Sequence, residues 1–184
     1  HHSAKFYDIK LSDDRQQIIL ATHFYTGTFL DTTHFWNFIL DADSSNNNVT
    51  NNAGFVTFNA SDGSLSSYGV AQTSLATLYN RETYSRTGLA VRNNQIFTQV
   101  HYQRDLLTDD TIYRSGSDVN YALALVRFHD SGHTISAIDF HSAHRSNSCF
   151  PLAFDHDGNL LISGSFATSG TIGGNTLQGT YLAK

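Results

Sequence analysis

Histidine is the residue type in this chain with the most evident capacity for chemistry. The sequence contains 10 histidines, of which His1 and His2 resemble the remnant of a purification tag. Two close pairs lie further along, His129 with His133 and His141 with His144. Imidazole is a common metal ligand, so four such side chains brought together across neighbouring strands would form a tetrahedral zinc site. The alternative is that they are exposed residues of turns and connecting segments, and no HExxH motif indicates a metalloenzyme.

Aromatic residues give the second candidate site. Trp36 is the single tryptophan and opens a long polar segment, with His34 and Asn37 beside it and Tyr25 upstream. Aromatic side chains on loops stack on sugars or anchor protein partners. We therefore predict that Trp36, His34, Asn37 and Tyr25 contact a ligand, which would be a glycan or a protein.

Patterns that would indicate catalysis are weak. The chain lacks the G-x-S-x-G motif of a nucleophile elbow, and Cys149 has no activating neighbours in the sequence. Residues 155–159 (DHDGN) resemble the start of a calcium loop, but Phe166 stands at the twelfth position, where such a loop has a bidentate Glu. A tight turn is the better interpretation. Aspartates are frequent enough that a secreted hydrolase fragment with a paired-carboxylate site stays as a third hypothesis.

Composition narrows the class of protein. With 184 residues, 40% of them hydrophobic, the chain is long enough for one domain with a core. The formal net charge is −5 and no basic run is present, which argues against nucleic acid as a partner. No apolar stretch approaches the ~20 residues needed to span a bilayer. The lack of Met predicts a processed or excised piece, and the polar surface, with only 15% charged residues, is typical of export from a bacterial cell.

The elements that must position these residues are β-strands arranged in repeats. Three segments read as strand, polar turn and strand, and each is followed by a further strand. The first two copies add a fourth strand, at 64–70 and 134–140. We predict a single repeat domain over 1–184, with a long polar loop insertion at 32–52. Its units are approximately 6–70, 88–140 and 150–184.

Alternation along the second strand of each copy predicts two distinct faces. A period of two places Ile18 and Leu20 on the face that carries Ile96 in the second copy and Leu160 in the third. The opposite face carries Ile19, Phe97 and Leu161 together with polar residues. Such mixed strands are expected to pack between neighbouring sheets.

Residues 153–184 (AFDHDGNLLISGSFATSGTIGGNTLQGTYLAK) carry a family resemblance. Their strand, D-x-x-G-N-like turn, strand ending in G-S-F, polar loop and Y-L-A-K resemble the bacterial β-propeller repeat of secreted proteins. The other two copies lack the turn glycine, although Phe24 and Tyr102 keep the closing aromatic residue. The resemblance implies four-stranded antiparallel blades around an axis and a role in binding or scaffolding at the cell exterior.

These expectations give an all-β fold of antiparallel, propeller-type blades in three repeat units, with a β-trefoil as the alternative. Propellers have 4–8 blades that bury their faces only against one another, so three blades leave two outer faces to be covered.

The predicted function is a non-catalytic, secreted or cell-surface module for binding or self-assembly, and the alternative is a lectin-like carbohydrate-binding domain. The expected partners are a protein or a second copy of the chain, or a glycan. No cofactor is required by this interpretation, with zinc or calcium as the metals to consider.

Overall fold

The computed structural model of the chain consists of β-strands, and no helix occurs among the residues that it describes. Those residues are 4–25, 28–29, 35–36, 51–73, 88–102, 105–108, 112–114, 122–140, 148–149, 152–172 and 174–184. The predicted all-β class is therefore confirmed for this part of the chain. No helix in it is long and apolar enough to cross a membrane.

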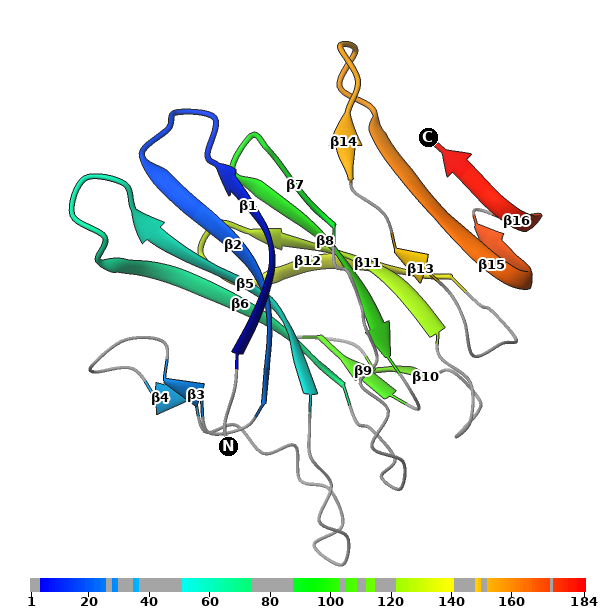
Figure 1. Cartoon of the computed structure of the whole chain (residues 1–184), viewed down its shortest axis with the longest axis horizontal. Helices are drawn as coiled ribbons and strands as arrows, with labels where there is room; N and C mark the ends of the chain where they lie inside the picture. Colours follow the sequence, from blue (N-terminus) through cyan, green and yellow to red (C-terminus); the bar gives the residue numbers. More distant parts are fainter. Residues whose placement is uncertain are drawn as a thin grey trace, which may run out of the picture.

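The first sheet is an antiparallel meander of the first unit (Figure 1). Its four main strands are β1 (Ala4–Leu11), β2 (Gln17–Tyr25), β5 (Asn51–Asn59) and β6 (Leu65–Thr73). A short hairpin of β9 (Asp105–Leu107) and β10 (Ile112–Arg114) extends it beyond β6. Of the predicted insertion at 32–52, the structure describes β4 (Phe35–Trp36), which pairs with β3 (Thr28–Phe29), and the start of β5. The rest of that segment lies outside the described residues.

The second and third sheets repeat the meander (Figure 1). The second contains β7 (Leu89–Arg92), β8 (Gln95–Tyr102), β11 (Ala122–His129) and β12 (Thr134–Phe140). In the third, β15 (Leu160–Ile172) pairs with β16 (Asn175–Ala183) on one side. Its other side pairs with two short strands, β13 (Ser148–Cys149) and β14 (Ala153–Phe154). Each of the three predicted hairpins, and each strand expected to follow it, is present.

Turn chemistry explains where these hairpins reverse. Asn93 and Asn94 both have positive φ, at 50° and 59°, which is the geometry of a two-residue turn of type I′. Asparagine tolerates this region because its short polar side chain bonds locally. Gly158 occupies the same region in the third hairpin, at φ 90°. The polar turns that the sequence indicated are thus the physical cause of the meander.

The three sheets stack face to face, with the second in the middle. One core cluster joins the first and second sheets through Ile19 and Phe55 on one side and Ile96 and Phe128 on the other. The Phe55 and Phe128 rings meet edge to face, with centroids 5.3 Å apart. A second cluster joins Ala90 and Leu125 of the second sheet to Leu152, Ile162 and Tyr181 in the third unit. The mixed faces predicted for β8 are therefore both buried, one against each neighbouring sheet.

Glycine allows the first and second sheets to approach closely. A Cβ atom on Gly69 of β6 would lie 2.3 Å from a ring carbon of Phe55 and 2.8 Å from the carbonyl oxygen of Gly132. Gly132 itself, in the β11–β12 turn at φ 99°, packs against the Tyr68 carbonyl. No side chain fits between these two backbones.

We therefore expect Gly69→Ala to lower the free energy of unfolding by about 1–3 kcal/mol, the usual cost of overpacking a core. Chemical denaturation would measure this. Gly63→Asn is the matched control, because Gly63 has positive φ but nothing within 4 Å of its Cβ position. Equal stability of Gly69→Ala and the parent chain would show that the sheets are not in close contact here.

Gln99 is a buried polar residue in the middle of the second sheet. Its side chain is fully buried, and neither amide atom has a hydrogen-bond partner among the described residues. It lies directly opposite Leu125, so both belong to the face that meets the third sheet. A buried polar group without a partner costs about 1–3 kcal/mol.

Replacing this amide by an apolar side chain of similar volume should remove that cost. We expect Gln99→Leu to raise the free energy of unfolding by about 1 kcal/mol. Gln17→Leu is the control, because the Gln17 amide donates a hydrogen bond to Ser66 Oγ at 3.2 Å and its loss offers no gain. A destabilised Gln99→Leu would contradict the assignment of Gln99 as an unsatisfied group.

Candidate functional site

The predicted ligand-binding residues fall mainly outside the described part of the chain. His34 and Asn37 are not described, and for Trp36 and Tyr25 the structure gives only the backbone, in β4 and β2. The predicted contact between these residues and a ligand stays a prediction. The same holds for His141 and His144 of the predicted metal cluster.

His129 and His133 close the β11–β12 turn. The His129 N–H donates to the carbonyl of His133 at 2.8 Å. His129 Nδ1 lies 2.6 Å from Asp130 Oδ1 and 3.1 Å from Ser131 Oγ. A Ser-His-Asp relay needs serine and aspartate on opposite ring nitrogens, whereas both contacts here involve Nδ1. This trio therefore stabilises a turn and has no catalytic geometry.

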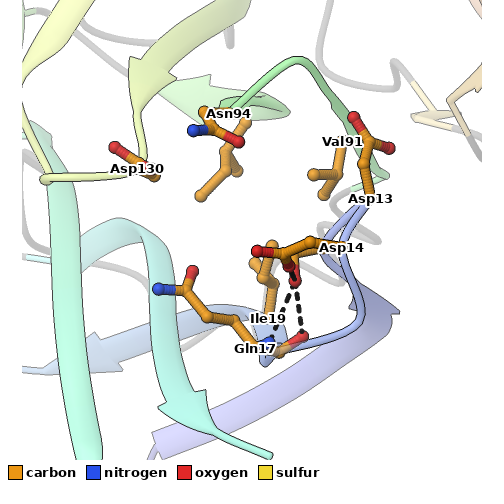
Figure 2. A pocket seen from close by; sticks show the side chains of 9 residues that line it. Asp13, Asp14, Gln17, Ile19, Val91, Asn94 and Asp130 are labelled. Carbon is orange, nitrogen blue, oxygen red and sulfur yellow. Dashed lines mark hydrogen bonds between the residues drawn. The ribbon is translucent and has the colours of Figure 1, made fainter.

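A small pocket opens where three turns meet at one end of the seam between the first and second sheets (Figure 2). Its volume is about 50 Å³, and Ile19, Val91 and Ile96 form its apolar floor. Asp13, Asp14, Asn94 and Asp130 are among the polar residues around it. Space of this size holds a few water molecules.

The carboxylates at this pocket already have local partners. Asp13 Oδ2 accepts the N–H of Asn93 at 2.6 Å, which ties the first sheet's turn to that of the second. Asp14 Oδ1 accepts from Ser12 Oγ at 2.6 Å and from the Gln16 N–H at 3.0 Å. Within the described residues, no group of three or more His, Cys, Asp or Glu side chains is arranged to hold a metal ion. The pocket is thus part of a structural seam.

Turn carboxylates carry the clearest electrostatic signature. Hydrogen bonds from the Asn159 side chain and backbone, followed by the ammonium of Lys184 at 3.1 Å, hold the pKa of Asp155 well below its usual range. Ser12 and the Gln16 N–H lower the pKa of Asp14 in the same way, and Ser64 lowers that of Asp62. The segment that resembled a calcium loop is a turn whose first carboxylate is bound by Asn159 and Lys184.

The lowered pKa values predict an acid-sensitive fold. A carboxyl whose pKa is depressed on folding contributes stability above its unfolded value of about 3.9, and this contribution is lost as the pH falls through the lower folded value. We expect the melting temperature to fall from about pH 4 downward, and less steeply in Asp155→Asn, which has no charge to lose. Melting curves between pH 6 and pH 2 would test this, with Asp157→Asn as the neighbouring control. Parallel losses in Asp155→Asn and the parent chain would contradict the prediction.

Among the described residues, one face of the first sheet exposes several large hydrophobic side chains. Leu11 lies opposite Ile18 and Ile9 lies opposite Leu20, so these four residues share a face, and it is the face turned away from the second sheet. We call it the first outer face; its eight residues are the exposed Phe6, Ile9, Leu11 and Tyr68, the half-buried Ile18, Leu20 and Phe58, and the buried Val56. Phe6 and Ile9 are each 61% exposed and Leu11 is 52% exposed. None of its eight residues is charged.

Equivalent positions in the second sheet are buried. When Ile96 of β8 is matched with Ile18 of β2, the strand pairings place Leu89 at the position of Ile9 and Val91 at the position of Leu11. Phe128 likewise corresponds to Phe58. Leu89 and Phe128 are fully buried and Val91 is partly buried, all against the first sheet. The first outer face therefore has the chemistry of a surface that packs against another sheet.

Sequence reasoning placed Ile18 and Leu20 on one face but did not identify that face as an exposed site. The signal was present in the sequence as the alternation of Ile9 and Leu11 in step with Ile18 and Leu20. Comparison of the chain with protein-family models, with curated proteins and with solved structures gave no match.

Proposed function

We propose that the chain is a non-catalytic β-repeat module of the propeller type, and that it acts at the cell exterior by binding or self-assembly through the outer faces of its stack. The observation that carries this proposal is the first outer face. Burying one isoleucine or leucine side chain stabilises a complex by roughly 1.5–3 kcal/mol, and this face presents several of them. Contiguous exposed apolar surface of this kind marks interaction sites.

The arrangement of the sheets supports a propeller over a trefoil. Each sheet is built around a meander, and the described strands contact one another from sheet to sheet, β1 with β7 and β5 with β8 in the first seam, and β7 with β14 and β12 with β15 in the second. Stacking of like units in one orientation is what propeller blades and other repeat arrays do. A trefoil would instead gather its three units around one common barrel.

The local chemistry supports a non-catalytic role. The histidine, serine and aspartate of the β11–β12 turn are engaged in turn bonds, and the one pocket described at the turns is too small for a substrate. The apolar first outer face is suited to a protein surface. The polar composition set out above supports export from the cell as part of the proposal.

Charge placed on the first outer face should abolish association. We expect the parent chain to have a mass in solution of at least twice 20.4 kDa, and the double variant Ile9→Lys with Leu11→Lys to be a monomer. The loss of two buried aliphatic side chains should weaken binding by at least about 100-fold. Size exclusion with light scattering over a range of concentrations measures this.

The matched control is Ala60→Lys with Ser61→Lys, which adds the same charge at exposed positions in the β5–β6 turn, away from both faces of the sheets. This variant should associate like the parent chain. A parent chain that is monomeric at every concentration, or a charged first outer face that leaves the mass unchanged, would overturn the proposed function.

A further inference from the structure

The third sheet has an outer face of its own. Leu182 lies opposite Ser163, and Ala153 lies opposite Leu161, which places them on the face turned away from the second sheet. Leu182 is the most exposed large hydrophobic residue described, at 72%. We call Ala153, Leu161, Ser163, Ser165, Thr180 and Leu182 the second outer face, which combines apolar residues with short hydroxyl side chains.

Strand register shows what this face is equivalent to. Leu182 occupies the position of Leu125 in the second sheet and of Phe55 in the first, because the three lie opposite Ser163, Gln99 and Ala21 respectively. Phe55 is fully buried and Leu125 is 5% exposed. Leu161 likewise occupies the position of Phe97 and Ile19, both packed between sheets.

The two internal seams use one and the same pairing of faces. In the first seam, the face of Ile19 and Phe55 packs on the face of Leu89 and Ile96. In the second, the equivalent face of the second sheet, with Phe97 and Leu125, packs on the face of Leu160 and Ile162. Each sheet therefore gives one kind of face to the sheet after it and the other kind to the sheet before it.

The two outer faces are the remaining halves of this pairing. The second outer face is equivalent by register to the face of the first sheet that contains Phe55. The first outer face is equivalent to the face of the second sheet that contains Leu89. We infer that the second outer face of one copy of the chain docks on the first outer face of a second copy, head to tail, and repeats the internal seam. This inference rests on the proposed function and names its partner.

Head-to-tail docking has a definite consequence for assembly. Such a contact joins two different surfaces, so it closes into a ring or continues into a filament. Two copies place six sheets in sequence, which lies within the 4–8 blades that close a propeller. We expect a closed dimer with two identical seams.

Two variants, each with one outer face disabled, provide the test. The first is Ile9→Asp with Leu11→Asp, and the second is Leu182→Asp; all three positions are exposed, so the folded monomer should tolerate the change. Each variant alone lacks one half of the seam and should be monomeric. An equimolar mixture should form a 1:1 dimer joined by one intact seam, and therefore weaker than the parent dimer, because the first variant keeps the second outer face and the second variant keeps the first. Ser61→Asp, an exposed position in the β5–β6 turn, should remain a dimer like the parent chain.

The outcomes separate the two proposals. A parent chain that is monomeric overturns both the proposed function and this inference. If the parent chain associates but the mixture stays monomeric, only the head-to-tail docking is overturned. The same holds if the Leu182→Asp variant still dimerises by itself, because two copies of the first outer face would then be pairing with each other. Far-UV circular dichroism checks the fold, and the milder pair Ile9→Ser and Leu182→Ser repeats the experiment if an aspartate variant has lost its β-sheet spectrum.

Discussion

The structure depends on one constraint: a sheet that is apolar on both faces must be covered on both. The second sheet meets it. Its Leu89, Ile96 and Phe128 are buried against the first sheet, while Ala90 and Leu125 are buried against the third unit. Burial of apolar area is the main favourable contribution to folding, and a single four-stranded sheet cannot supply it alone. The outer two sheets satisfy the constraint on one face each.

Polar groups and glycines set how the sheets align. The Asp13 carboxylate accepts a backbone N–H from the neighbouring turn, and Arg92 lies over the Phe154 ring at 5.4 Å, so each seam has a contact at its turn end. Gly69 and Gly132 let two backbones meet where any side chain would separate them. These contacts are directional, whereas apolar packing is not, and they favour one alignment of the stack.

The proposed function follows from what the stack leaves uncovered. In the described turns, Asp14, His129 and Asp155 are engaged in local hydrogen bonds. The first outer face, in contrast, has the apolar composition of the internal seams, and the second outer face occupies the register positions of Phe55 and Leu125. A module whose ends resemble its own interior is suited to extension by like units.

Prediction from sequence succeeded for local structure. Hairpins at β1–β2 and β7–β8, the third strand of each unit and the turn at Asn93–Asn94 all follow from short-range alternation and from residues that tolerate positive φ. It could not show that His129 and Asp130 bond each other within a turn, nor that Asp155 is held by Lys184, because these contacts depend on side-chain direction and on residues far apart in the chain.

The sequence by itself determined that each strand has two faces and which residues share them, because side chains alternate with a period of two. Only the tertiary structure decided which face meets which sheet, because the two faces of a strand such as β8 are both apolar enough to be buried. Leu182 and Leu125 stand at the same register position, yet one is exposed and the other buried. The difference in exposure depends on whether a further sheet packs on that face. The alternation of side chains along a strand contains no information about the neighbouring sheet.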